Sequence, residues 1–349
     1  MSDIEATPPP VKKYKILDWV QQHKDKLNME SISLKSKAVL FLEENPEMID
    51  WEYISYNTGA MHIIKKNLHR INWDILSGNK GAIDILKEHP DKINWNKLCS
   101  IRTNEAYELL KDNTDKITDW NNLCKNISDW INDLLDGNID KLNRHDIRDL
   151  SRNPNAIPTI EKYLDKMNWE SISGNTEAFH LLLAHPEKIV LNTLQDNEHP
   201  DVIKLYDKYD PRGCLSNYDV AELSHMVEYL RKHPNAMSSY ICGNENPEAL
   251  DLMKEYVLRT GDCDIQLLSF NPIAIDFLFE HFENDVDWFC FCQQNNDKAI
   301  KIIEKNIDKV NWRTLSYNNK AIHILEKNID KLNWVGISEN DGIYEEIDC

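Results

Sequence analysis

The sequence predicts an all-α protein, an α-solenoid of about 14 tandem two-helix repeats of about 22–25 residues each. One observation is that the string INWDILSGNKGAIDILKEH at 71–89 returns nearly unchanged as NWRTLSYNNKAIHILEKN at 311–328. A second is that tryptophan recurs at an interval of 22 residues from Trp51 to Trp73 and on to Trp95. Because each repeat packs only on its neighbours, such an array can reach 349 residues without one large core.

The first helix of each unit is expected to be short and to begin at the tryptophan. Asn72 precedes Trp73 and is a good N-cap, since its side chain accepts a hydrogen bond from an early helical N–H. Trp73 and Leu76 are three residues apart and therefore share one helix face. The run Ser77-Gly78-Asn79 ends this helix, and Cys99 and Cys124 take the place of the serine in two later units.

The second helix of each unit is expected to begin after the asparagine that follows the Leu-Ser pair. Sister units place proline directly after this asparagine, as in Asn153-Pro154, Asn246-Pro247 and Asn271-Pro272. Asparagine at the cap with proline in the first turn is a typical helix start. Ala82, Ile83 and Leu86 then form an apolar helical stripe, and His89-Pro90 ends the helix. Ile93 is expected to hold the connecting loop against the core.

The tryptophans are expected to be the interior contacts that join successive layers of an elongated rod. One unit has too little apolar surface to fold alone, whereas a tryptophan can bury ~150–250 Å² against adjacent copies. The alternative is a row of aromatic platforms for stacked bases. The core interpretation is favoured because each tryptophan is in phase with the leucine, alanine and isoleucine of its unit. The anchors are Trp51, Trp73, Trp95, Trp120, Trp169, Trp288, Trp312 and Trp334.

The chain divides into an array with two ends. Residues 1–10 are polar and proline-rich and are expected to be a disordered tail. Residues 11–28 match the second half of a unit and are predicted to form an N-terminal capping helix. The array itself runs over 29–333, with 192–262 divergent from the pattern. Residues 334–349 are predicted to be a truncated, acidic C-terminal capping unit, since a terminal repeat needs a polar outer face.

Composition excludes several classes of function. The net charge of −19 disfavours nucleic acid and anionic membranes, because affinity for both comes mainly from Lys and Arg. The eight cysteines show no regular framework, and no secretory signal or long apolar run is found. These features predict an intracellular protein with free thiols.

No motif indicates catalysis, a cofactor or a metal. Phosphate loops, nucleophile elbows and dinucleotide fingerprints are absent from the sequence. Cys290-Phe291-Cys292, with His281 nearby, is the nearest approach to a metal site, but zinc sites need a second pair of ligands. The recurring Asp-Lys pairs are expected to form an exposed ladder of ion pairs. The recurring asparagines are expected to cap helices and bond between units rather than bind a peptide main chain.

Candidate partner-binding residues are those that vary on the second helix of a unit. One set comprises Lys80, Asp84, Lys87 and Glu88, and a second set comprises Glu177, His180 and Leu183. Trp130 is out of phase with the anchor Trp120 and is therefore a candidate for an exposed contact.

The pattern LeuSer-x-Asn-x-x-AlaIle followed by Asn-x-AspLysIleAsnTrp resembles the tandem short-repeat proteins of giant viruses, the mimivirus-like lineages of nucleocytoplasmic large DNA viruses. The resemblance covers about 29–340 and implies host cytoplasm or virion as the location, without catalytic residues. The favoured hypothesis is a non-enzymatic scaffold that binds a protein with a basic or neutral surface, without cofactor or metal. The alternatives are a virion component that bridges capsid proteins and, disfavoured by charge, a nucleic-acid-binding repeat protein.

Overall fold

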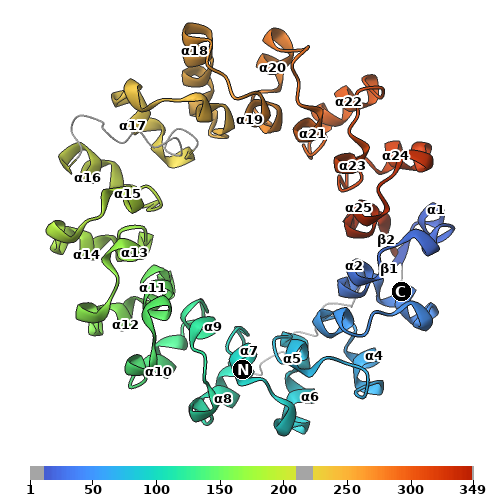
Figure 1. Ribbon diagram of the computed structural model, residues 1–349, viewed down its shortest axis with the longest axis vertical. Coiled ribbons are helices and arrows are strands. Elements are labelled where there is room, and N and C mark those ends of the chain that lie inside the picture. The colour runs from blue at the N-terminus through green and yellow to red at the C-terminus, as the bar shows by residue number, and fades with distance from the viewer. Residues whose placement is uncertain (1–11, 210–222, 348–349) are drawn as a thin grey trace, which may run out of the picture.

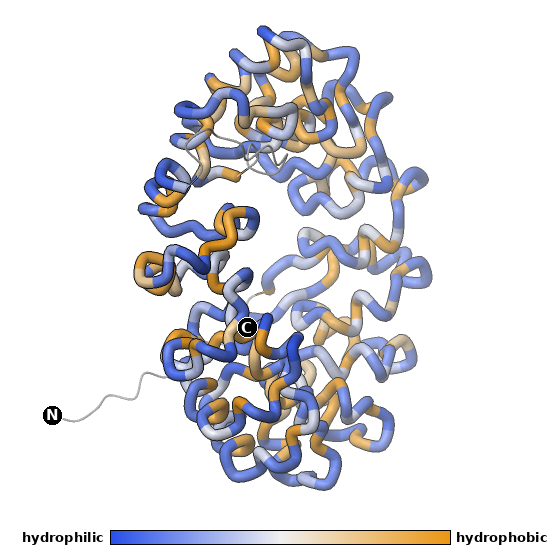
Figure 2. The backbone as a smooth tube through the Cα atoms, turned by 60° about the vertical axis from the view of Figure 1, so that its left-hand side comes forward, coloured by the Kyte–Doolittle hydropathy of each residue, from blue (hydrophilic) through white to orange (hydrophobic). Residues whose placement is uncertain are grey.

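The protein is helical, as predicted. The computed structural model describes residues 12–209 and 223–347, which form short α-helices and 3-10 turns together with two four-residue strands. The predicted tail at 1–10 lies outside the described residues. Figure 1 shows that successive helices follow one another around a closed ring, with the first helix of each unit on an inner circle and the second on an outer circle. Figure 2 shows apolar and polar segments alternating along the whole tube.

The inner circle consists of the helices that begin at or near the anchor residues. They are α2 (Met29–Leu34), α5 (Trp73–Leu76), α7 (Trp95–Leu98), α9 (Asn121–Cys124), α11 (Arg144–Arg152), α13 (Trp169–Ser173), α15 (Leu191–Leu194), α19 (Ile265–Phe270), α21 (Trp288–Phe291), α23 (Trp312–Leu315) and α25 (Trp334–Glu339). Two units use a 3-10 helix instead, η4 (Tyr53–Tyr56) and η16 (Ser239–Gly243).

The second helices complete the units. They are α1 (Asp18–Gln21), α3 (Val39–Glu44), α4 (Met61–Lys66), α6 (Ile83–Glu88), α8 (Asn104–Lys111), α10 (Ile131–Leu135), α12 (Ile157–Lys162), α14 (Phe179–Ala184), α16 (Val202–Tyr209), α17 (Val227–Lys232), α18 (Leu250–Thr260), α20 (Ile275–His281), α22 (Asp297–Lys305) and α24 (Ile322–Leu325). We number the units from unit 1 at 28–49, unit 2 at 50–71 and unit 3 at 72–93 to unit 10 at 238–263, unit 11 at 264–286, unit 12 at 287–310 and unit 13 at 311–332.

In many of the units a serine hydroxyl joins the unit to the next. In unit 3 the Ser77 Oγ accepts a hydrogen bond from the backbone N–H of Asn94, the N-cap of the next unit, at 2.9 Å. The same bond is made by Ser33, Ser55, Ser151, Ser173, Ser269 and Ser316 to Asp50, Asn72, Asn168, Val190, Asp287 and Asn333. Because these hydroxyls are buried, the bond fixes the spacing of neighbouring units.

The asparagine after each Leu-Ser pair has two structural roles. The Asn175 Oδ1 accepts from the backbone N–H of Glu177 and so caps its own second helix, while Nδ2 donates to the carbonyls of Ser151 and Asn153 in the preceding unit. Equivalent amide bonds recur at Asn57, Asn153, Asn197, Asn271, Asn318 and Asn340. These buried amides are occupied by the fold, so the alternative of a peptide-binding asparagine ladder is wrong.

The ring is closed by the two ends of the described chain. Strand β1 (Lys13–Ile16) pairs antiparallel with β2 (Tyr344–Ile347), and the backbone N–H of Leu17 donates to the carbonyl of Ile343 at 2.9 Å. Helices α2 and α25 pack side by side next to this pair. The N-terminal and C-terminal segments therefore meet, although they are more than 300 residues apart in the sequence.

The two ends together make one complete unit. The His23 ring stacks on Trp334 at 5.4 Å between centroids, as His89 packs on Trp73 in unit 3. The Lys26 ammonium lies over the Trp334 ring at 5.3 Å, as Lys331 lies over Trp312 in unit 13. Unit 14 is thus composite: its first helix, α25, comes from 333–343, and its second helix, α1, comes from 17–27.

Two sequence-based expectations are corrected by this closure. The predicted capping helix at 11–28 is instead a strand, the four-residue α1 and a 3-10 turn at Lys24–Lys26. The predicted rod with separate caps is a ring, because each end is half a unit and supplies the half that the other lacks. Neither half needs a polar outer face, since each is covered by its complement.

The divergent segment keeps the alternation of short inner elements and outer helices in its described parts. Leu223 precedes a 3-10 turn and α17, so Leu223-Ser224 stands at the start of a second helix rather than in a Leu-Ser pair. Helix α18 is the long exception, with 11 residues, and it ends at Gly261 in the left-handed conformation with φ of +70°.

The anchor tryptophans contribute to the core to different degrees. Trp120 is buried with 3% of its surface exposed, whereas the other seven anchors are half-buried and pack against the core through part of the indole. The fully buried positions belong to leucine and isoleucine, such as Leu76 and Leu86 in unit 3. The aliphatic stripe, more than the indoles, therefore forms the continuous interior.

Candidate functional site

The first predicted set of partner-binding residues lies exposed on the outer circle. Lys80 stands in the 3-10 turn before α6, and Asp84, Lys87 and Glu88 project from α6 itself. The Glu88 carboxylate pairs with the Lys65 ammonium of the preceding unit at 3.0 Å. This exposure is compatible with binding, but the pair is one of several exposed links between neighbouring outer helices.

The second predicted set lies four units further around the ring. Glu177, His180 and Leu183 are exposed on the turn before α14 and on α14, and 60% of the Leu183 surface is accessible. His180 Nε2 is 2.7 Å from the Glu161 carboxylate of the preceding unit. The structure therefore does not bring the two predicted sets together, because α6 and α14 occupy separate parts of the circle (Figure 1).

Trp130 is not an exposed contact. Its side chain is half-buried and packs on the Tyr107 ring with the centroids 5.6 Å apart. Its indole Nε1 is buried and has no hydrogen-bond partner in the part of the chain that the structure describes. The residue is out of phase with Trp120 because it stands at the entry to the second helix, α10, where it fills the space between units 4 and 5.

Most anchor tryptophans have a cationic or imidazole group of their own unit on or beside the ring. The Arg70 guanidinium lies 4.0 Å from the Trp51 centroid and the Lys116 ammonium 4.5 Å from the Trp95 centroid. The same arrangement holds for Trp120, Trp288, Trp312 and Trp334 with Lys141, Lys309, Lys331 and Lys26. The lysines of five Asp-Lys pairs therefore lie over tryptophan, a cation–π contact. Lys166 instead pairs with Asp140 of the preceding unit, as in the predicted ladder of ion pairs.

The described cysteines and histidines are spread over many units. Within residues 12–209 and 223–347, no three His, Cys, Asp or Glu side chains are grouped to hold an ion. Cys292 is buried in the place of the repeat serine, and burial raises its pKa to about 11. A neutral thiol in that position is a packing group.

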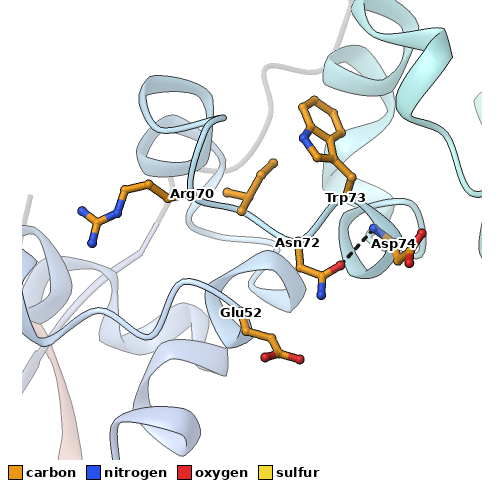
Figure 3. Close-up of a pocket in the computed structure, with 6 residues that line it drawn as sticks. Glu52, Arg70, Asn72, Trp73 and Asp74 are labelled. Atoms are coloured by element: carbon orange, nitrogen blue, oxygen red, sulfur yellow. Dashed lines mark hydrogen bonds between the residues drawn. The ribbon is translucent and has the colours of Figure 1, made fainter.

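Figure 3 shows a recess between units 2 and 3 with a volume of about 500 Å³, lined by Glu52, Arg70, Asn72, Trp73 and Asp74. Its polar groups belong to the repeat. Asn72 Oδ1 accepts from the backbone N–H of Asp74 at 3.0 Å, and Asp74 Oδ1 accepts from the side chain of Asn94. The dashed bond in Figure 3 is the first of these. The side chains of Asn72 and Asp74 in the recess are therefore held by bonds of the repeat.

A different surface stands out on the inner circle. Six consecutive units around the closure, units 11 to 14 and then 1 and 2, each expose one large apolar side chain on the first helix or directly after it. These six residues, which we call the inner arc, are Phe270, Phe289, Tyr317, Val335, Leu34 and Tyr56, and each has 40–53% of its surface exposed. Each belongs to an inner element that packs beside the next.

The inner arc occupies two specific places in the repeat. The first is the position directly after the anchor residue. The second is the position directly after the serine, which lies four residues beyond the first and on the same helix face. In units 3, 4, 6, 7 and 8 these places hold small or polar residues: Asp74, Gly78, Asn96, Ser100, Arg148, Arg152, Glu170, Gly174, Asn192 and Asp196. The arc is not visible when whole units of the sequence are aligned, because each unit contributes only one of its residues. It becomes visible when a single position is followed from unit to unit.

No family model, curated protein or solved structure matches this chain. Among the described helices, none combines the length and apolar character needed to cross a bilayer. The geometry of the ring is therefore the main evidence on function.

Proposed function

We propose that the protein is a closed α-solenoid, a ring of about 14 two-helix units, and that it acts as a non-enzymatic scaffold that binds a protein partner. The observation that carries this proposal is the inner arc. Six neighbouring units each offer one exposed apolar side chain, while the same places in the described parts of units 3, 4, 6, 7 and 8 hold small or polar residues. Isolated exposed apolar residues are ordinary, but a gathered set is typical of an interaction site.

Ring closure is what makes the arc continuous. Phe270, Phe289, Tyr317 and Val335 come from the C-terminal part of the chain, whereas Leu34 and Tyr56 come from the N-terminal part. The two groups become neighbours only because α2 packs beside α25. An open array would separate them at opposite ends.

The chemistry of the arc suggests the partner. In units 1, 2 and 14, the other of these two repeat positions holds an exposed carboxylate, at Glu30, Glu52 and Glu339. The whole chain also has a net charge of −19. A protein segment with apolar side chains flanked by Lys or Arg would satisfy both features. We therefore infer a partner with a neutral or basic surface, in agreement with the expectation from composition.

The resemblance of the repeats to giant-virus proteins supports a viral origin and a place in infected host cytoplasm or in the virion. A virion component that bridges capsid proteins is the second candidate. A repeat ring with an exposed apolar arc would serve either role. Quantitative proteomics of purified particles separates them, because a structural component would be present at high copy number.

Capture experiments test the scaffold proposal. Purified protein is immobilised and exposed to lysate of infected cells, beside a variant carrying Phe289→Ser and Tyr317→Ser. The matched control carries Leu258→Ser, which removes an exposed apolar group from α18 on the outer circle, away from both predicted sets. We expect specific proteins to be lost with the arc variant and retained with the control. Equal retention by all three would contradict the proposal.

Nucleic acid is the third candidate, and two observations weigh against it. The chain is strongly acidic, and the tryptophan rings that might stack on bases already carry lysine or arginine from their own unit. A gel shift at ~50 mM salt with single-stranded RNA and DNA tests it. Tight binding would support the nucleic-acid candidate.

A further inference from the structure

Two cysteines of unit 10 are in direct contact. Cys242 Sγ and Cys263 Sγ are 3.7 Å apart, although 21 residues separate them in the sequence. Cys242 stands in the 3-10 helix η16 on the inner circle, and Cys263 stands in the connection that leads from α18 to α19. Both are free thiols.

The contact follows from the repeat. Cys242 takes the place of the serine that receives the N–H of the next N-cap, here Asp264. Cys263 takes the place of the apolar residue that holds the connection, such as Ile93 in unit 3. In unit 6 the same two places are filled by Ser151 and Met167, whose Oγ and Sδ are 3.5 Å apart. The fold therefore sets these two side chains against each other in unit after unit.

The other cysteines at the serine place lack such a partner. Cys99, Cys124 and Cys292 face Ile117, Leu142 and Val310 at the connection place. Within the described residues, unit 10 is thus the unit where both places hold a thiol. The cysteines without a thiol partner, such as Cys292, can therefore serve as controls in the same chain.

We propose that Cys242 and Cys263 form a reversible intramolecular disulfide by exchange with a low-molecular-weight disulfide of the glutathione type. The sulfurs are in contact, and small side-chain rotations would bring them to the ~2.05 Å of a bond. The bond would tie the inner element of unit 10 to the entry of unit 11 and would enclose α18 in the loop. It is a modification site that is independent of the partner-binding proposal.

The two thiols have different roles in the exchange. Cys263 is half-exposed, and the hydrogen bond from Cys242 lowers its pKa against the opposing influence of burial and of Asp262 and Asp264. Cys242 is buried, and its hydrogen bond to Cys263 together with burial raises its pKa. Since the thiolate is the nucleophile, Cys263 is the attacking group and Cys242 the resolving one.

The exchange balances in two steps. Cys263 Sγ loses its proton and attacks one sulfur of glutathione disulfide, whose S–S bond breaks, and the first glutathione leaves as a thiolate that takes up the proton. Cys242 Sγ then loses its proton and attacks Cys263 Sγ, the mixed disulfide breaks, and the second glutathione leaves and is protonated. Two protein thiols are oxidised to one disulfide, and one glutathione disulfide is reduced to two thiols.

Mass spectrometry of the full chain tests the proposal. The protein is equilibrated with graded ratios of glutathione disulfide to glutathione, quenched by alkylation and digested. We expect a cross-linked peptide that joins Cys242 to Cys263, while Cys292 stays fully alkylated as a thiol. In the reduced protein, we expect Cys263 to be alkylated at least about tenfold faster than Cys242. The oxidised chain should also melt at a higher temperature than the reduced chain.

Two variants sharpen the test. Cys242→Ser restores the repeat residue and should leave Cys263 as a lasting mixed disulfide with glutathione. Cys263→Ile restores the usual apolar residue and should leave Cys242 unmodified. The proposal is overturned if the wild type accumulates the mixed disulfide without the cross-link, if Cys263 stays reduced throughout the series, or if Cys292 is oxidised to the same extent.

Discussion

The Ser338 Oγ accepts a hydrogen bond from the backbone N–H of Asn28 at 2.8 Å, although 310 residues separate the two in the sequence. The same bond joins Ser316 to Asn333 at 3.0 Å in consecutive units. The closing contact is therefore not a new interface. It is the ordinary contact between neighbouring repeats, made once between the two ends of the chain.

Because the closing contact and the contact between units 13 and 14 are the same, Ser338 and Ser316 offer a matched pair of substitutions. Both serines also donate to the carbonyl of their anchor tryptophan, at 2.7 Å in each case. We expect Ser338→Ala and Ser316→Ala each to cost about 1–2 kcal/mol, because an N-cap N–H loses its acceptor. Urea unfolding measures both. If the ring were open in solution, Ser338→Ala would cost clearly less than Ser316→Ala.

The closure also carries a charged contact at the place of the repeat asparagine. Lys35 stands where most of the described units have the buried asparagine, and its ammonium donates to the carbonyl of Glu339 and to the carboxylate of Asp341. Lys37 lies 3.4 Å from the same carboxylate. Partial burial raises the pKa of Asp341, but the combined effect of Lys35 and Lys37 outweighs it and leaves the pKa below its usual value.

A pH dependence of closure follows. A carboxylate whose pKa is lowered in the folded state stabilises that state above its unfolded pKa of ~3.9 and loses the effect as pH falls through the folded value. We therefore expect Asp341→Asn to destabilise the protein at pH 7 and to have a smaller effect at about pH 3. Thermal melting at both pH values measures this. An equal effect at both would show that the charge is not involved.

Gly342 at the closure and Gly78 in unit 3 differ in the space around them. A Cβ on Gly342 would stand 2.7 Å from the carbonyl oxygen of Asn319, a backbone atom that cannot move aside, whereas a Cβ on Gly78 would have no neighbour closer than 3.5 Å. We expect Gly342→Ala to destabilise the protein by about 1–3 kcal/mol and Gly78→Ala to be neutral or slightly stabilising. Denaturant midpoints of the two variants decide this. Equal midpoints would contradict the close packing of unit 14 on unit 13.

The buried asparagines that bond between units lead to a further prediction. Asn175→Ala removes the donor to two buried carbonyls and the cap of the following turn, so we expect a loss of about 2–3 kcal/mol. Asn192→Ala is the control, because Asn192 is exposed on α15. Chemical unfolding of both variants is the measurement. A loss below about 0.5 kcal/mol for Asn175→Ala would show that these amides do not hold units together.

Local features of the repeat were predictable because they depend on neighbouring residues. Asn72 as an N-cap, Leu76 and Leu86 as core and the proline-marked starts of second helices all follow from short-range spacing, and the structure has them. The match of 11–28 to the second half of a unit predicts helix at 13–16, yet this segment is a strand in which Ile16 pairs with Tyr344. That pairing depends on a segment at the other end of the chain.

The candidate site was harder to predict for a related reason. Whether an apolar residue is core or surface depends on its place in the unit, and Phe289 and Tyr317 stand at places that are polar in most units. Their grouping with Leu34 and Tyr56 appears only after the ends meet. The variable residues of α6 and α14 are exposed as expected, but nothing in their spacing indicated that they would lie apart.

The most direct test of the closed ring is zero-length carbodiimide cross-linking of the monomer at high dilution, followed by peptide mass spectrometry. The Lys15 ammonium and the Glu345 carboxylate are 2.8 Å apart across the two strands, and both are accessible. Lys320 and Asp297, 2.7 Å apart in consecutive units, are the internal control. The account predicts that both links form within one chain. A sample in which Lys320 links to Asp297 but Lys15 never links to Glu345 would contradict it.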